Sequence, residues 1–330
     1  MAVLKGREEH PEKVLKEKIF NRSAKVAVIG LGYVGLPLAA EQAKIGFSVV
    51  GIDKDLRKVE QINQGKSYIR DVSDDVLSAL VENGSLRATG CCEPLKEADI
   101  IIICVPTPLK SMRQPDLSFV ISAAREVAGQ IRTGQLISLE STTFPGTTQE
   151  VVLPILESAG LTVGKDFFLA FSPERVDPGN RHYTAREISK VVGGVTPLCR
   201  DVACAFYSQS LRQVVPVSSP AAAEMTKIFE NTYRSVNIAL VNEFMILCDR
   251  MGIDVWEVVE AAALNLAQHS LPYYAQELAT ALHAFYDTDE CRVLTEDRAL
   301  SQARLKLVAA CKTVLANTLA LIGVRAPEQM

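Results

Sequence analysis

Three glycines at a fixed spacing are the residues of this sequence that most directly imply a chemistry. Gly30, Gly32 and Gly35 follow an apolar run at residues 25–29 and open a stretch with helical spacing. In a strand–turn–helix unit such glycines allow a tight turn, close approach of the backbone to a pyrophosphate and close packing of helix on strand. The helix N-terminus offers free N–H groups to phosphates. The pattern predicts a dinucleotide site, with an ordinary glycine turn of an α/β protein as the alternative.

The cofactor expected in this site is NAD. Asp53 ends the next apolar run, eighteen residues after Gly35, where a carboxylate can accept hydrogen bonds from the adenosine ribose and would repel a 2′-phosphate. Lys54 and Arg57 weaken the preference for NAD over NADP, and Arg57 is itself a candidate cofactor contact. Tyr33 and Val34, inside the glycine pattern, complete this half of the predicted site.

Composition limits the classes of function. Nearly half of the 330 residues, 48%, are hydrophobic, so a sizeable core is available. The net charge of −4 argues against a protein whose main ligand is a nucleic-acid backbone. No apolar run is long enough for a membrane span, so we expect a cytoplasmic protein. The eight cysteines lack metal-ligand spacing, and we expect no metal site; a redox role for Cys91 and Cys92 is the less favoured reading of that pair.

Short apolar runs alternating with helical stretches predict an α/β fold with a Rossmann-type parallel sheet. Their continuous apolar character is typical of strands buried on both faces. The expected strands cover residues 25–29, 48–52, 99–105, 135–140, 167–171 and 190–192.

Beyond residue 219 the pattern becomes helical. We expect a helix of about thirty residues that opens at Ala221 and stops at Gly252, and two further helices in the last sixty residues, at about 272–287 and 300–322. The resulting domains are an N-terminal helical appendage at 1–24, an NAD-binding Rossmann domain at 25–219, central dimerisation helices at 220–266 and an all-helical C-terminal tail at 267–330.

Five motifs occur together within residues 24–263. They are Gly-Tyr-Val-Gly-Leu-Pro at 32–37, Val-Pro-Thr-Pro at 105–108, Glu-Ser-Thr-Thr at 140–143, Phe-Ser-Pro-Glu-Arg at 171–175, and Lys227 with Asn231. This set resembles the UDP-glucose/GDP-mannose dehydrogenase family. The sequence around the motifs resembles the UDP-N-acetylglucosamine/UDP-N-acetylmannosamine 6-dehydrogenase branch of that family. Members of that family oxidise the C6 alcohol of a UDP-sugar to a carboxylate with two NAD in succession, through a thioester on a cysteine.

The resemblance assigns roles to several residues. It places Val105, Pro106, Thr107, Ser141 and Thr142 around the nicotinamide half of the cofactor, at strand ends where a doubly wound sheet binds its ligands.

The resemblance also implies three catalytic residues. Glu174 would manage a water or proton during thioester hydrolysis. Lys227 and Asn231, four residues apart on one helix face, would stabilise the developing oxyanion. Without the family, a surface carboxylate is the less favoured alternative for Glu174, whereas a solvated stripe is the more favoured interpretation of Lys227 with Asn231. The same helix forms the dimer core in relatives, so a homodimer is expected.

The resemblance breaks after residue 263. The family continues with a glycine-rich loop that carries the catalytic cysteine, and then with a UDP-binding domain. No Gly-Gly-x-Cys follows Gly252. The tail from about residue 269 resembles instead the helical anticodon-binding domain of arginyl-tRNA synthetases, above all in Leu-Ile-Gly-Val-Arg-Ala-Pro-Glu-Gln-Met at 321–330. A generic two-helix cap is the alternative.

These features favour a nucleotide-sugar 6-dehydrogenase by origin, inactive in this chain and chimeric or truncated, whose binding of a UDP-sugar is doubtful. The rival from another class is a non-catalytic NAD-binding dimer with a helical interaction module. A tRNA-binding tail is disfavoured, because residues 267–330 hold six Lys and Arg against seven Asp and Glu.

Overall fold

The computed structural model describes residues 10–110, 114–174 and 189–258, with six isolated positions between 301 and 312. The chain divides into two compact units, Met1–Val236 and Asn237–Met330, and each is described by itself. The helices expected at 272–287 and 300–322 lie almost entirely outside the described residues. Among those that are described, no helix combines the length and apolar character that crossing a membrane requires.

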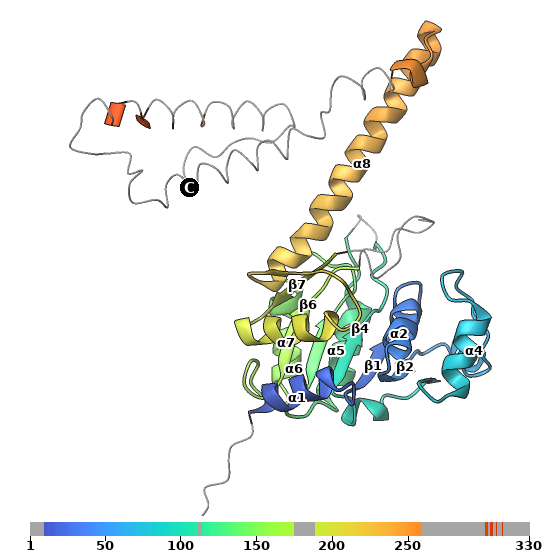
Figure 1. Ribbon diagram of the computed structural model, residues 1–330, viewed down its shortest axis with the longest axis vertical. Helices are drawn as coiled ribbons and strands as arrows, with labels where there is room; N and C mark the ends of the chain where they lie inside the picture. Colours follow the sequence, from blue (N-terminus) through green and yellow to red (C-terminus); the bar gives the residue numbers. More distant parts are fainter. Residues whose placement is uncertain are drawn as a thin grey trace, which may run out of the picture. The chain divides into compact units, whose positions relative to one another are not determined.

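The first unit is built on one eight-stranded sheet with the order β3-β2-β1-β4-β5-β6-β7-β8 (Figure 1). The chain starts at β1 in the middle of the sheet, moves outward through β2 and β3, and then crosses to β4 on the other side of β1. This order confirms the expected Rossmann-type arrangement. The strands are β1 Lys25–Ile29, β2 Ser48–Ile52, β3 Leu86–Thr89, β4 Ile100–Ile103, β5 Leu136–Leu139, β6 Phe168–Phe171, β7 Lys190–Gly194 and β8 Val214–Val217.

Helices connect the strands and cover the sheet. They are α1 Pro11–Phe20, α2 Gly35–Lys44, α3 Leu56–Asn63, α4 Asp74–Glu82, α5 Ser118–Ala128, α6 Leu153–Glu157, α7 Pro197–Tyr207 and α8 Pro220–Met251, with a short 3₁₀ helix at Glu93–Lys96 and a π-helix at Thr147–Val152.

Two strands and one strand direction differ from the sequence-based expectation. β3 and β8 were not expected, because β3 carries Arg87 in a four-residue run and β8 contains Pro216. Both lie at the edges of the sheet, where short strands and prolines are tolerated. β7 runs antiparallel to β6, so the sheet is mostly rather than entirely parallel.

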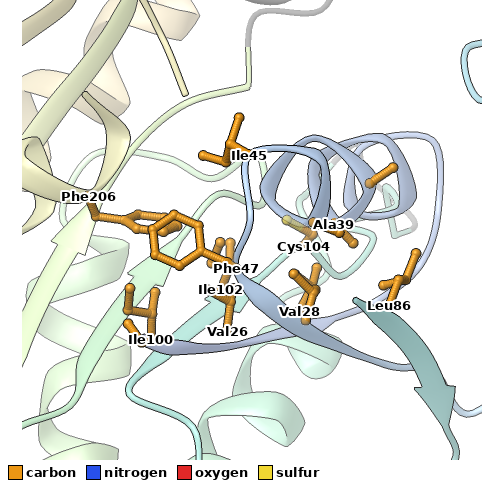
Figure 2. Close-up of a cluster of buried hydrophobic side chains, with 14 of the residues drawn as sticks. Val26, Val28, Ala39, Ile45, Phe47, Leu86, Ile100, Ile102, Cys104 and Phe206 are labelled. Carbon is orange, nitrogen blue, oxygen red and sulfur yellow. The ribbon is translucent and has the colours of Figure 1, made fainter. Parts of the chain in front are cut away.

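Apolar strands are continuous because both faces of the sheet are buried. On β1, Val26 and Val28 belong to one hydrophobic cluster and Ala27 and Ile29 to the other. Figure 2 shows part of the first cluster, in which Val28 lies near Ala39 of α2, and Phe47 and Phe206 pack together with ring centroids 5.7 Å apart. Helices α1, α2 and α7 cover this face, and α5 and α6 cover the other.

Helix α1 joins the first cluster through Leu15 and Ile19, both buried. Lys18 on the same helix reaches Asp99, whose carboxylate also accepts hydrogen bonds from the Lys25 amide and the Arg132 guanidinium. The N-terminal helix is therefore fixed to the sheet by packing and by a shared carboxylate.

Helix α8 is 32 residues long, close to the expected length, and Gly252 ends it as predicted. Gly252 has φ 68°, and the amides of Gly252 and Ile253 donate to the carbonyl oxygens of Asp249 and Cys248. A left-handed residue after the last turn satisfies carbonyl groups that the helix leaves free.

We expect Asp99→Asn to lower the free energy of unfolding by about 2 kcal/mol, because two cations and an amide would lose a common carboxylate. Burial opposes ionisation of Asp99, but hydrogen bonds from Lys18, Lys25 and Arg132 outweigh it and hold its pKa below the usual 3.8. The stabilisation is therefore present above pH 3.8 and is lost as pH falls through the lowered pKa. Urea denaturation across this pH range measures it.

The matched control is Glu97→Gln, which removes an exposed carboxylate paired with Lys25. Its effect should be much smaller than that of Asp99→Asn, because an exposed ion pair contributes little to stability. A loss at Asp99 no larger than at Glu97, or one independent of pH, would contradict the assigned role.

Candidate active site

A cavity of about 660 Å³ opens where β1, β2, β4 and β5 end. In the sheet, β1 has β2 on one side and β4 on the other, so the strand order reverses at β1. Open α/β sheets bind their ligands at such a switch point, beyond the carboxyl ends of the strands. Most of the residues expected from the sequence line it: Gly30, Gly32, Tyr33, Val34, Asp53, Val105, Pro106, Thr107, Ser141, Thr142 and Glu174.

The glycine loop forms one wall of the cavity. Gly30 has φ 91°, and a Cβ placed there would lie 2.6 Å from the carbonyl oxygen of Cys104. A Cβ on Gly35 would lie 1.8 Å from the carbonyl oxygen of Gly30, whereas a Cβ on Gly32 would meet nothing within 4 Å. Gly30 and Gly35 are thus required by close backbone packing, and Gly32 faces open space beside the helix N-terminus.

Asp53 lies at the end of β2 and holds this loop. One carboxylate oxygen accepts a hydrogen bond of 2.9 Å from the Leu31 amide, and the other accepts one from the Asp55 amide. Lys58 Nζ approaches the first oxygen at 3.3 Å, and the Tyr68 hydroxyl donates to the Leu31 carbonyl oxygen. The carboxylate is therefore oriented from several directions at the edge of the cavity.

Arg57 lies apart from the other expected cofactor contacts. Its guanidinium is exposed, pairs with Asp55 through two contacts of 3.1 Å and is absent from the cavity lining. Lys58 takes the position beside Asp53 instead. The sequence feature that could have predicted Lys58 in place of Arg57 is Asp55, the N-cap of α3. The position of the N-cap determines which side chains of the first helical turn point back toward β2.

The loops after β4 and β5 form the opposite wall. The Ser141 hydroxyl donates to the Val105 carbonyl oxygen at 2.8 Å and so ties the two loops together. Pro106, Thr107 and Thr142 complete this wall.

Glu174 lines the cavity, and Lys227 of α8 contacts its main chain without itself belonging to the cavity lining. Lys227 Nζ donates to the main-chain oxygen of Glu174 at 2.8 Å, although the two residues are far apart in sequence. Burial lowers the pKa of Lys227, and the negative charge of Glu174 opposes that shift. Asn231, one turn further along α8, is exposed and is absent from the cavity lining.

Behind Glu174 lies a buried polar network that was not expected from the sequence. Lys190 Nζ pairs with Glu140 at 2.7 Å and lies 4.0 Å from Glu174. The Tyr207 hydroxyl donates to the other oxygen of Glu140 and also contacts the Ser138 hydroxyl at 2.7 Å. Five polar side chains from β5, β7, α7 and the two strand ends thus share one network.

The charges of this network are coupled. Burial would lower the pKa of Lys190, but the carboxylates of Glu140 and Glu174 outweigh it and raise the pKa. Burial raises the pKa of Glu140, and the ammonium of Lys190 opposes that rise. Burial, reinforced by Glu140, also keeps the Tyr207 phenol protonated with a raised pKa. The sequence does contain a signal, since a lysine and a glutamate at the ends of buried strands require partners.

Comparison with known proteins adds the family. Residues 24–211 match the model of the UDP-glucose/GDP-mannose dehydrogenase family, NAD binding domain, and residues 221–276 match the central domain of the same family. The chain belongs to the UDP-glucose/GDP-mannose dehydrogenase family. This confirms the family predicted from the motifs and NAD as its cofactor.

Curated relatives place the chain in the expected branch of the family. It is 37% identical over 243 residues to a UDP-N-acetyl-D-glucosamine 6-dehydrogenase of Pseudomonas aeruginosa, covering 73% of this chain and 57% of that protein. It is 39% identical over 239 residues to a UDP-N-acetyl-D-mannosamine dehydrogenase of Pyrococcus horikoshii, covering 72% and 57%. The chain therefore spans a little over half the length of these relatives.

Solved structures agree with this assignment. A UDP-D-ManNAc dehydrogenase from Pyrococcus horikoshii superposes with a TM-score of 0.69 at 38% identity, covering 74% of this chain and 58% of that one. A ternary complex of GDP-mannose dehydrogenase from Pseudomonas aeruginosa gives 0.68 at 27% identity, covering 73% and 57%.

The C-terminal part matches a different family. Residues 250–330 match the DALR anticodon binding domain, as the tail motifs predicted. The two matches overlap at 250–276, so the change of family falls within this range rather than at one residue.

We expect the chain to bind NAD at least about tenfold more tightly than NADP, because a 2′-phosphate beside Asp53 would bring two negative groups together. Asp53→Asn should narrow that ratio about fivefold, since the amide oxygen can still accept from Leu31 without a charge. Titration calorimetry with each nucleotide measures both ratios.

Glu97→Gln is the control, because Glu97 also pairs with a cation, Lys25, and is absent from the cavity lining. It should leave the ratio unchanged. Equal or tighter binding of NADP by the unsubstituted protein would show that Asp53 does not face the ribose.

Proposed function

We propose that this chain is an NAD-dependent nucleotide-sugar 6-dehydrogenase by descent, shaped for oxidising the C6 alcohol of a UDP-sugar to a carboxylate. Such products are precursors of polysaccharides. The observation that carries the proposal is one cavity lined by the glycine loop, Asp53 and Glu174, with Lys227 hydrogen-bonded to the main chain of Glu174 from outside the lining. A dinucleotide bound along it would bring its nicotinamide to Glu174 and Lys227.

The residues at that end suit the parts of such an oxidation. Bound NAD would accept a hydride from the sugar C6. Lys227 supplies an ammonium in a partly buried position, where a positive charge stabilises a developing oxyanion strongly. Glu174 can position a water or carry its proton. Asn231, one turn away on α8, offers an amide donor to a substrate that covers this exposed face of the helix.

We further propose that these 330 residues do not complete the oxidation. Holding the substrate as a thioester requires a thiolate beside the nicotinamide, and no Gly-Gly-x-Cys occurs after Gly252. The match to an anticodon binding domain occupies that part of the sequence.

A non-catalytic NAD-binding homodimer is the second candidate, favoured by one face of α8. Met225, Phe229, Tyr233 and Val236 repeat at helical spacing, and all four are exposed, Phe229 by 65%. A contiguous apolar stripe of this kind is typical of a surface that pairs with another molecule. Lys227 and Asn231 lie on the opposite side of the helix, so pairing would leave the cavity accessible.

We expect no steady production of NADH when NAD is mixed with UDP-N-acetylglucosamine or UDP-N-acetylmannosamine, because the thiolate is missing. Absorbance at the NADH band measures it, and NAD binding in the same sample shows that the cofactor site is formed.

Cys291, which lies outside the described residues, is the tail cysteine flanked by charged residues on both sides, Glu290 and Arg292. Turnover that is abolished by Cys291→Ser would refute the proposed inactivity and identify Cys291 as the nucleophile. Turnover that survives this substitution would refute it as well and require another thiol.

The dimer makes a separate prediction. Phe229→Glu should weaken self-association by about tenfold or more, because a charge would enter an apolar contact. Sedimentation velocity over a concentration series measures the dissociation constant. Ser235→Glu is the control, since it adds the same charge to an exposed position away from the stripe. A protein that is monomeric at all concentrations, or that responds equally to both changes, would contradict this use of the face.

A further inference from the structure

Helix α5 contributes a carboxylate to the cavity that the glycine fingerprint does not include. Glu126 lines the cavity beside Ser122 of the same helix and Lys54 of the loop after β2. Its Oε1 lies 2.8 Å from Lys54 Nζ, and Ser122 donates to the same oxygen at 3.3 Å and contacts Lys54 at 3.0 Å. Lys54 directly follows Asp53, the residue expected to face the ribose. The Lys54 side chain therefore links Glu126 to this part of the site.

The second oxygen of Glu126 accepts a hydrogen bond from the Cys92 thiol at 3.1 Å. Burial and the neighbouring Glu126 raise the pKa of Cys92 to about 12, so the thiol stays protonated and continues to donate. Burial opposes ionisation of Glu126, but Lys54 and Cys92 outweigh it and lower its pKa. Glu126 is therefore an oriented carboxylate that is charged at neutral pH.

The cations at this rim are matched one by one with carboxylates. Lys58 pairs with Asp53 at 3.3 Å, Lys54 pairs with Glu126, and Arg57 pairs with Asp55 outside the cavity lining. Sites that accept a 2′-phosphate supply a cation to it. Lys54, the lysine that directly follows Asp53 in the sequence, already has an anionic partner supplied by another helix.

We propose that Glu126 is a second specificity residue, which disfavours a 2′-phosphorylated cofactor by pairing with Lys54, the cation that could otherwise pair with the phosphate. The proposal rests on the NAD site of the proposed function. It assigns part of the discrimination between NAD and NADP to α5, which follows β4 in the chain, and not only to the region around the glycine loop. Asp53 repels the phosphate directly, and Glu126 removes the cation that would otherwise compensate.

The test is titration calorimetry with NAD and NADP at low ionic strength on the full chain and two variants. Glu126→Gln keeps the shape of the side chain and releases Lys54, so NADP should bind about five- to tenfold more tightly. The affinity for NAD should change by less than about twofold. Adding Lys54→Gln to Glu126→Gln should remove the gain in NADP affinity, because the released ammonium is its source.

Glu97→Gln is the matched control, since Glu97 is also paired with a lysine at 2.8 Å but lies outside the cavity lining. It should change neither affinity. Unchanged NADP binding in Glu126→Gln with NAD binding retained would overturn the proposal, and so would a gain that persists without Lys54. Absence of NAD binding by the unsubstituted chain would overturn both the proposal and the cofactor site on which it rests.

Discussion

The close contact between the start of α2 and the end of β1 is the constraint on which the cavity depends. Because Gly35 has no side chain, the helix can approach the Gly30 carbonyl oxygen to a distance that a Cβ would prohibit. This contact brings the helix N-terminus to the edge of the sheet and leaves Gly32 facing open space. Asp53 accepts a hydrogen bond from the Leu31 amide and so holds the glycine loop in place. The residue expected to bind the adenosine ribose therefore also positions the loop expected to bind the pyrophosphate.

A second constraint acts at the far end of the cavity, where charges are buried. Removing charged groups from water is costly unless they find partners, so Glu140, Lys190 and Tyr207 must be arranged together. Their arrangement fixes the position of an ammonium 4.0 Å from Glu174. In this low-dielectric region, the charge state of the cavity end depends on Lys190 and Tyr207, which are absent from the cavity lining.

Much of the fold follows from patterns that the sequence displays locally. The apolar run Lys25–Ile29, the glycines after it and the stop at Gly252 each have one physical explanation, and the structure agrees with all three. The edge strands β3 and β8 were not predictable from apolar periodicity, since edge positions tolerate Arg87 and Pro216. The pairing of Lys190 with Glu140 joins residues fifty positions apart, and nothing local in the sequence selects that partner. For the same reason Lys58, rather than Arg57, could be assigned to Asp53 only once α3 was oriented.

The reversed direction of β7 has a consequence for how the site can diverge. If β7 were parallel to β6, it would begin at the opposite end of the strands. Because β7 is antiparallel, it begins beside the end of β6, and Lys190 lies 4.0 Å from Glu174. The chain segment between them leaves and re-enters the sheet at the same edge. Its length can change at a small entropic cost, because loop closure depends only weakly on length. Insertions and deletions between the two strands can therefore be tolerated, while the register of the strands and the buried ion pair of Lys190 with Glu140 are inherited unchanged.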